Sequence, residues 1–324
     1  MADSDDRLSA RERERDAPDG GPLAVYAGER PAAPAWFEEA VASPYRRGTV
    51  DLDGAAIHYQ EWGEPRQPGV LLVHGNGAHA HWWDFVAPYI SADRHVVAMT
   101  FSGMGESDWR PAYRMAQFAR EQVAVCEATG LFDAPEKPVL IAHSFGGFVA
   151  LQTAAEAGDR FAGAVIVDSA LLPPDAERPG PPRRTRPNRV YPDLATALGR
   201  FRLAPPQPCE NHYLMDYIAR WSLKRVESDE DKGYAWKFDP FIFQSLDDWT
   251  RPGQLVGQGR CPFAVMRGED SVLVTDKVWT YMKTLFAPGT PFISVPHAEH
   301  HVMLDQPLAF ISALRTLLET WPGR

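Results

Sequence analysis

A serine stands at the junction of a short apolar run and an alanine-rich segment, in Val139–Ala150, which reads VLIAHSFGGFVA. A buried strand that breaks at small–polar–Ser–bulky–Gly–Gly and continues as a helix places Ser144 at the tip of a strand–turn–helix corner. Its hydroxyl is exposed there, and the first amides of the helix can hydrogen-bond an anion. Both features suit a nucleophile that attacks a carbonyl carbon. Ala142 stands where this motif usually has its first glycine, whereas Gly146 and Gly147 keep the second site.

The loop after the last predicted strand contains three histidines, His297, His300 and His301. The corner at Ser144 could also be purely structural, with a serine there by chance. A nucleophilic serine needs a base within reach, so such a base would favour the catalytic interpretation. A histidine in such a loop can reach a serine at the end of a neighbouring strand, and its ordinary pKa near neutrality lets it take and return a proton. The order Ser then His along the chain favours this interpretation over three solvated histidines.

Three carboxylates are candidates for orienting that imidazole. Glu269 and Asp270 follow the strand that precedes the histidine loop, and Asp168 directly follows the strand after Ser144. Each lies at the carboxyl end of a predicted parallel strand, where the sites of open α/β sheets gather. Each could instead cap the next turn, so the residues alone do not decide which carboxylate orients the imidazole.

The first parallel strand is followed by His74-Gly75-Asn76-Gly77. A flexible loop at this position can turn a backbone N–H toward the tip serine. The amides of Asn76 and Phe145, with Gly75 giving the loop its freedom, could therefore stabilise a developing oxyanion. Without Ser144 the same loop would be interpreted as a glycine-rich turn.

Two other chemistries find less support. Gly103-Met104-Gly105 does not extend to the full dinucleotide-binding pattern with an acidic residue at the expected distance. His79, His81 and Asp84 offer possible metal ligands but have no companion cluster of acid and histidine. We therefore predict neither a cofactor nor a metal, and expect Trp82 and Trp83 to pack beside the oxyanion loop.

The composition of the 324 residues, 44% hydrophobic and 23% charged, is that of an ordinary soluble protein. The net charge of −10 would repel nucleic acid and anionic membranes, so neither is expected as a partner. The three cysteines, Cys126, Cys209 and Cys261, are far apart and suggest reduced thiols, and the charged N-terminus does not resemble a secretory signal. We expect a cytoplasmic protein and make no prediction of its oligomeric state.

Short apolar runs alternate with helical patterns from Val70 onward, which predicts a doubly wound, mostly parallel sheet. An antiparallel pair around Asp53-Gly54 precedes it, formed by 49–52 and 56–59. The parallel strands are expected at 70–73, 96–99, 139–142, 164–167, 263–266 and 292–295. A short helix is expected near 34–42, and the helices between and after the strands at 82–90, 115–128, 145–157, 277–285 and 308–320.

The domain organisation predicted from these patterns has three parts. Residues 1–22 alternate opposite charges and are expected to be a disordered tail. Residues 23–171 and 260–324 form the α/β core. Residues 172–259 interrupt the alternation of strands and helices and are expected to be an inserted helical lid. The lid begins with a proline-rich connection at 173–192, and its helices are expected at 193–202, 213–226 and 241–249.

The order of these motifs resembles the α/β-hydrolase fold superfamily, close to its lid-bearing epoxide hydrolases, haloalkane dehalogenases and carbon–carbon bond hydrolases. The resemblance runs from about Val50 to Trp321 and is carried by His74-Gly75-Asn76-Gly77, Ser102-Gly103-Met104-Gly105-Glu106-Ser107-Asp108, His143-Ser144-Phe145-Gly146-Gly147 and His300-His301-Val302-Met303-Leu304-Asp305-Gln306-Pro307.

The resemblance also assigns roles. The first two of those groups have an aspartate at the tip position, so Ser144 argues against both of their activities. The register of the last motif places the catalytic histidine on His300. The family's acid would stand at Ser271, so the resemblance leaves Asp270 or Glu269 after a local shift, or Asp168, and we expect Asp270 first.

The activity implied is hydrolysis of a carboxylic ester or lactone through an acyl-enzyme, with a carbon–carbon bond hydrolase as the alternative. A slow-turnover ligand-sensing protein with the same fold is a second class. The expected partner is a small molecule with an apolar or aromatic part, because the lid is rich in aromatic residues that could line a pocket over Ser144. These are Tyr213, Tyr217, Trp221, Tyr234, Trp236 and Phe238.

Overall fold

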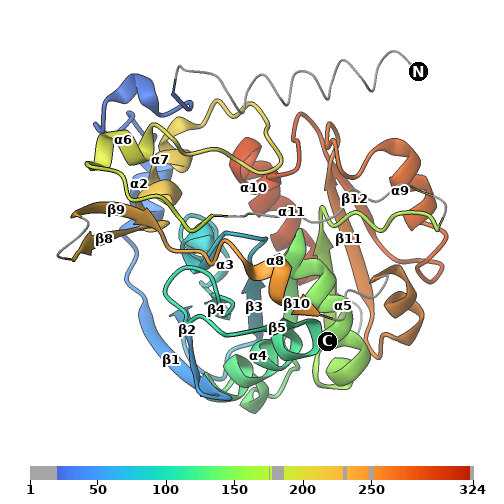
Figure 1. The fold of residues 1–324 in the computed structure, drawn as a ribbon. Coiled ribbons are helices and arrows are strands. Elements are labelled where there is room, and N and C mark those ends of the chain that lie inside the picture. The colour runs from blue at the N-terminus through green and yellow to red at the C-terminus, as the bar shows by residue number, and fades with distance from the viewer. Residues whose placement is uncertain (1–19, 175, 177–185, 229–231, 248–251, 322–324) are drawn as a thin grey trace. The chain divides into compact units, whose positions relative to one another are not determined.

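The computed structural model describes residues 20–174, 176, 186–228, 232–247 and 252–321 (Figure 1). The chain divides into two compact units, a larger one of residues 34–188 and 237–324 and a smaller one of residues 1–33 and 189–236. Residues 1–19 of the predicted tail and half of the predicted proline-rich connection, residues 175 and 177–185, lie outside the described residues. The two units are considered separately below.

The larger unit is built on an eight-stranded, mostly parallel sheet, which confirms the predicted α/β-hydrolase architecture. Its strands stand in the order β1-β2-β4-β3-β6-β7-β11-β12, where β2 is antiparallel to both of its neighbours, β1 and β4, and every other neighbouring pair is parallel. Their bounds are Arg46–Leu52 for β1, Ala55–Trp62 for β2, Gly69–Val73 for β3, His95–Met99 for β4, Val139–His143 for β6, Gly163–Val167 for β7, Phe263–Gly268 for β11 and Phe292–Val295 for β12.

The central strands are buried along their whole length, because helices cover both faces of the sheet. Every residue of β3, β4, β6 and β7 is buried, which explains their nearly continuous apolar sequences. The turn between β1 and β2 has positive φ angles at both central residues, 51° at Asp53 and 75° at Gly54. This is the tight hairpin predicted from the Asp-Gly pair.

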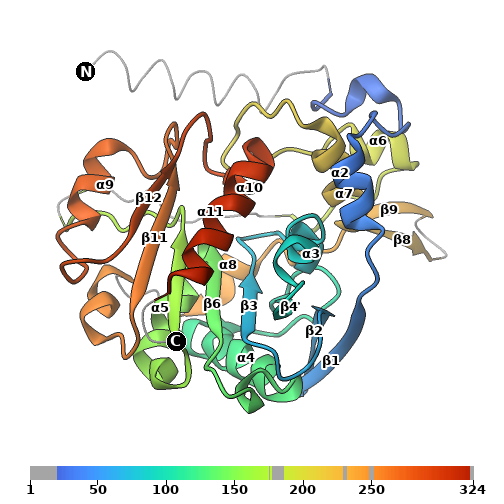
Figure 2. The same cartoon turned by 180° about the vertical axis from the view of Figure 1, so that it is seen from behind.

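Helices α4 (Met115–Ala128) and α5 (Phe145–Ala157) lie on one face of the sheet, and α3 (Ala87–Ile90) and α11 (Pro307–Glu319) on the other (Figures 1 and 2). The other helices of this unit are α2 (Ala35–Val41), α8 (Ile242–Ser245), α9 (Asp276–Met282) and α10 (Val302–Asp305). Short 3-10 turns occur at Ala80–Trp83, Leu131–Asp133, Gly158–Arg160 and Pro252–Gln258. A two-residue strand, β10 (Leu246–Asp247), pairs in parallel with β5 (Tyr113–Arg114).

Two helix predictions in this unit need correction. The stretch 82–90 is not one helix: a 3-10 turn ends at Trp83 and α3 starts at Ala87, with Pro88 in its first turn. Proline lacks the N–H that would continue a helix from the preceding turn, whereas it is well tolerated in a first turn. The predicted helix at 241–249 reaches only Ser245 before the chain enters β10, and Trp249 lies outside the described residues.

The smaller unit differs from the predicted helical lid. It contains a 3-10 turn at Ala24–Tyr26, the helices α6 (Leu194–Leu198) and α7 (His212–Trp221), and an antiparallel hairpin of β8 (Leu223–Glu227) and β9 (Lys232–Trp236). The helix predicted at 213–226 was wrong beyond Trp221. Ser222 is the C-cap residue, and its hydroxyl donates to the carbonyl oxygen of Ile218 before the chain continues as an extended strand.

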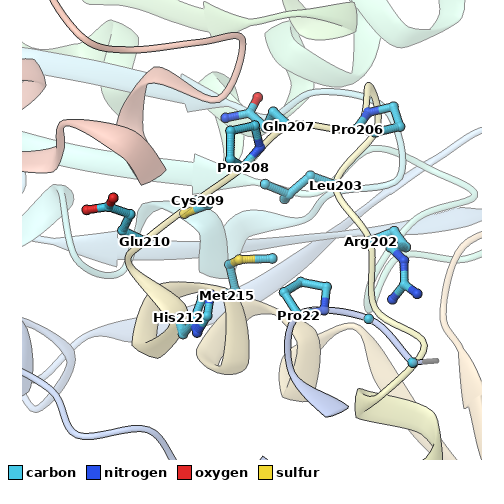
Figure 3. A pocket seen from close by; sticks show the side chains of 12 residues that line it. Pro22, Arg202, Leu203, Pro206, Gln207, Pro208, Cys209, Glu210, His212 and Met215 are labelled. Atoms are coloured by element: carbon cyan, nitrogen blue, oxygen red, sulfur yellow. The ribbon is translucent and has the colours of Figure 1, made fainter. Parts of the chain in front are cut away.

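The N-terminal segment belongs to this smaller unit rather than to the core, which moves the predicted boundary at residue 23. Tyr26 contacts His212 with 2.9 Å between its hydroxyl oxygen and Nδ1, and Arg220 Nη2 donates to the carbonyl oxygen of Gly28 at 2.7 Å. A cavity of about 710 Å³ lies within the unit (Figure 3). Its wall includes Pro22, Leu203, Pro208 and Met215 together with polar side chains such as Glu210. Whether the unit acts as a lid stays a prediction.

Candidate active site

Ser144 occupies a sharp corner between β6 and α5. Its backbone angles, φ 54° and ψ −119°, lie in a region that non-glycine residues rarely adopt, so the corner is strained and directs the side chain out of the sheet. The next two glycines make the corner possible. A β-carbon on Gly146 would come within 2.5 Å of the carbonyl oxygen of His74, and one on Gly147 would collide with Ser169 Oγ.

His300 is the histidine that reaches this serine. It follows β12, is 1% exposed, and places Nε2 at 2.9 Å from Ser144 Oγ. His297, at the start of the same loop, is exposed, and His301 is buried against Trp82 with 5.5 Å between ring centroids. The sequence register that favoured His300 therefore agrees with the geometry.

The carboxylate beside His300 belongs to Asp168, at the end of β7. Its Oδ1 lies 2.8 Å from His300 Nδ1, and the residue is 1% exposed. Nδ1 therefore carries the proton and donates it to Asp168, which leaves Nε2 to accept the hydroxyl proton of Ser144.

The structure brings Asp168 to His300 and leaves Asp270, which was expected first, away from it. Asp270 is exposed and its backbone N–H donates to the carbonyl oxygen of Ala298, while Glu269 is exposed as well. The physical reason is topological: β7 lies directly between β6 and β11, so its carboxyl end faces the histidine, whereas the turn after Gly268 directs the next two side chains outward.

Further contacts fix the acid and the base, and sequence reasoning did not anticipate them. Asp168 Oδ2 accepts the backbone N–H of Gly268 at 2.8 Å, and Asp168 Oδ1 also accepts the hydroxyl of Ser271 at 2.7 Å. His143 Nε2 donates to the carbonyl oxygen of His300 at 2.9 Å. The sequence did contain one indication that Ser271 lies near this carboxylate: it stands where the family resemblance places an acid.

Three further buried histidines, His74, His143 and His301, are held neutral. Burial lowers the pKa of His74 to about 4. Burial, followed by repulsion from His300, lowers the pKa of His143 and of His301 well below the ordinary value. At neutral pH these imidazoles therefore add no positive charge beside Ser144.

The predicted oxyanion loop passes close to the serine. A β-carbon on Gly75 would lie 3.1 Å from Ser144 Cβ, so a larger residue there would press on the nucleophile. The neighbouring His74 fixes the loop, because it donates Nδ1–H to the carbonyl oxygen of Gly75 at 2.6 Å. Asn76 is exposed on this loop and Phe145 is the first residue of α5. That their amides hold an oxyanion stays a prediction.

The second Gly-x-Gly loop has a structural task. The carbonyl oxygen of Gly103 accepts the backbone N–H of Asp239 at 2.7 Å, and the carboxylate of Asp239 accepts the hydroxyl of Tyr113 at 2.9 Å and the N–H of Phe241 at 2.8 Å. These contacts fix the start of α8. Phe243 on that helix packs edge-on against Phe145, with 6.0 Å between ring centroids.

Two of the candidate metal ligands, His81 and Asp84, contact each other. His81 Nδ1 contacts Asp84 Oδ2 at 2.7 Å, and both residues are buried. Within the described residues, no three His, Cys, Asp or Glu side chains are grouped so that they could hold a metal ion. In the same part of the chain, no helix has the length and apolar character needed to cross a membrane.

Comparison with known proteins identifies the family of this chain. A family model described as the alpha/beta hydrolase family matches residues 70–313. The esterase Rv0045c of Mycobacterium tuberculosis is 26% identical over 278 residues, which are 83% of this chain and 88% of that protein. An uncharacterised hydrolase of Bacillus subtilis, YugF, is 28% identical over 82% of this chain and 94% of its own length.

Solved structures show the same fold. The crystal structure of the Mycobacterium tuberculosis esterase matches with a TM-score of 0.65 and 22% identity over 93% of this chain and 99% of that one. An E-2-(acetamidomethylene)succinate hydrolase matches with a TM-score of 0.69 and 18% identity over 86% of this chain and 100% of that one. At these identities the likeness concerns the fold.

Proposed function

Because the chain belongs to the alpha/beta hydrolase family, we propose that it is a serine hydrolase that cleaves a carboxylic ester or lactone through an acyl-enzyme intermediate. Its relatives of similar sequence include proteins named as an esterase and a lipase, so esterase-like hydrolysis is the activity to expect of this member. The observation that carries the proposal is the unbroken chain of hydrogen bonds from Asp168 through His300 to Ser144.

The proposed reaction uses these three side chains in turn. Ser144 Oγ attacks the carbonyl carbon while its proton moves to His300 Nε2, and Asp168 stabilises the imidazolium that forms. The N–H groups of Asn76 and Phe145 would receive the negative charge that develops on the carbonyl oxygen. His300 then returns the proton to the leaving alkoxide, which departs as the alcohol and leaves the acyl group on Ser144. Water, deprotonated by His300, releases the acid.

The proposed substrate has an apolar or aromatic part. Support comes from Phe243 and Phe148, which are half-buried aromatic side chains on α8 and on the helix that begins beside Ser144. Apolar side chains of this kind commonly line small-molecule sites, where they exclude water from the reacting bond. The aromatic residues of the smaller unit remain a second, sequence-based reason for the same expectation. A cytoplasmic location also stays a prediction.

A labelling experiment with a turnover assay tests the proposal. Wild type should react with a fluorophosphonate probe and hydrolyse short nitrophenyl esters through many turnovers. Ser144→Ala should lose the label and at least about a thousandfold of the turnover, because the nucleophile is gone. Ser312→Ala, which changes an exposed serine of α11, serves as the matched control and should behave as wild type. Product formation that stops after one equivalent would favour the ligand-sensing alternative, and equal labelling of Ser144→Ala would refute the nucleophile.

A further inference from the structure

His143 is the last residue of β6 and directly precedes Ser144. Its side chain is buried, and Nε2 lies 2.9 Å from the backbone carbonyl oxygen of His300. A carbonyl oxygen only accepts hydrogen bonds, so Nε2 carries a proton. Burial, followed by repulsion from His300, lowers the pKa of His143 well below its ordinary value. At neutral pH the ring is therefore uncharged, with its proton on Nε2 and none on Nδ1.

The ring of His143 contacts two loops of the site at once. Its centroid lies 4.8 Å from that of His300 and 5.6 Å from that of His301, both in the loop after β12. Its Nδ1 would lie 3.1 Å from a β-carbon on Gly75, so the ring also lies against the predicted oxyanion loop. One buried imidazole on the strand of the nucleophile thus packs against both loops that must surround the reacting carbonyl.

The position of His300 is demanding, because its ring serves two partners. Nδ1 lies 2.8 Å from Asp168 Oδ1, and Nε2 lies 2.9 Å from Ser144 Oγ. These two bonds fix the ring, whereas the bond from His143 fixes the backbone from which the ring projects. A displacement of that backbone by about 1 Å would lengthen at least one ring contact, and misplacements of this size can lower a rate by about a hundredfold.

We infer that His143 is a positioning residue for the base: the proton on its Nε2 ties the backbone of His300 to the strand that carries Ser144. The bond joins positions that are 157 residues apart in the chain, so the placement of the base does not depend on its own loop alone. The inference rests on the proposed function for its meaning in catalysis.

Two amide substitutions form a matched pair for this test. The amide nitrogen of glutamine is as many bonds from Cβ as Nε2 of histidine, whereas that of asparagine is one bond closer and does not reach the carbonyl of His300. His143→Gln should keep kcat within about fivefold of wild type. His143→Asn should lower kcat by about tenfold to a hundredfold while KM changes little, because the base is misplaced and the substrate pocket is not.

The expected order of kcat is wild type, then His143→Gln, then His143→Asn. His143→Phe keeps a ring without a donor and should resemble His143→Asn. Equal kcat values for the glutamine and asparagine variants would overturn the inference. A lowered unfolding midpoint with wild-type kcat in His143→Asn would do so too, because the role would then be structural only.

Nuclear magnetic resonance supplies a readout that depends on neither turnover nor the folding of a variant. In wild type at neutral pH, the nitrogen signals of His143 should show a protonated Nε2 and an unprotonated Nδ1, and the opposite tautomer would refute the inference. The proton between His300 Nδ1 and Asp168 should give a far-downfield signal that persists in His143→Gln and shifts or broadens in His143→Asn. If these signals behave as expected but wild type does not turn over esters, the inference holds and the proposed function fails.

Discussion

The buried imidazole of His74 should make the protein sensitive to acid, and its contribution can be calculated. The side chain is 1% exposed, donates to the carbonyl oxygen of Gly75 and accepts the backbone N–H of Phe101 at 3.0 Å. The bond from Phe101 requires the neutral ring, because a protonated Nε2 could not accept it. Burial accordingly lowers its pKa to about 4, whereas in the unfolded chain it takes up a proton at its ordinary value of 6.5.

The sign and size of the effect follow from this difference. As the pH falls from 6.5 to about 4, the unfolded state binds a proton that the folded state does not, so the free energy of unfolding decreases. With about 1.4 kcal/mol for each pKa unit, His74 alone accounts for a loss of about 1.8 kcal/mol between pH 7 and pH 5. His143 and His301 act in the same direction, because the pKa of each is also lowered.

Urea unfolding followed by circular dichroism at pH 7, 6 and 5 measures this loss. The informative variant is His74→Gln, whose amide can donate to Gly75 and accept from Phe101 but does not titrate. Its loss of stability on acidification should be smaller than that of wild type by about 1.8 kcal/mol. The control is His297→Asn, in an exposed residue with φ 54°, an angle that asparagine tolerates, and it should lose as much as wild type.

The quantity to compare is the decrease in the free energy of unfolding between pH 7 and pH 5. Any destabilisation that the substitution itself causes at pH 7 cancels in this difference. Equal losses for wild type and His74→Gln would refute the reasoning, since His74 would then titrate alike in the folded and unfolded states.

Three other predictions follow from the site. His300→Ala should lower kcat by about a thousandfold or more while His297→Asn keeps wild-type rates, and similar rates for all three proteins would mean that another base acts. Asp168→Asn should cost on the order of 10⁴ in kcat and Asp270→Asn less than about twofold; the reverse order in the ester assay would restore Asp270 as the acid. Gly268→Ala should destabilise by about 1–3 kcal/mol in thermal unfolding, because its β-carbon would collide with the carbonyl oxygens of Ala298 and Glu299. Gly257→Ala, with nothing near its added carbon, should have little effect.

The sheet was predictable because each of its strands can be recognised from a short local pattern in the sequence. Val70–Val73 and Val139–Ala142 are short apolar runs between loops, and a strand buried on both faces needs nothing more to be recognised. Ser144 and His300 were predictable for a related reason, since each stands in a short motif at a strand end. The corner at Ser144 is visible from a dozen neighbouring residues.

Which carboxylate lies beside His300 was not predictable from local sequence. Asp168 and Asp270 each follow a parallel strand, and a choice between them depends on which strand end faces His300 after the sheet has assembled. The strand order places β7 between β6 and β11, and no stretch of sequence records that order. The strand β8 at Leu223–Glu227 was missed because its residues continue a helical pattern, and pairing with β9 outweighs that propensity.

Asn188 and Phe238 form the stem of an inserted segment. The side-chain amide of Asn188 donates to the carbonyl oxygen of Phe238 at 2.6 Å, so the chain leaves the larger unit and returns to it at one point. Trp109 donates to the carbonyl oxygen of Lys237 at 3.2 Å and secures the returning end. When the two ends of an insertion are held together, its length and sequence hardly affect the entropy of closing the host fold. Residues 189–236 can therefore be exchanged or remodelled as a cassette while the fold of the larger unit stays unchanged.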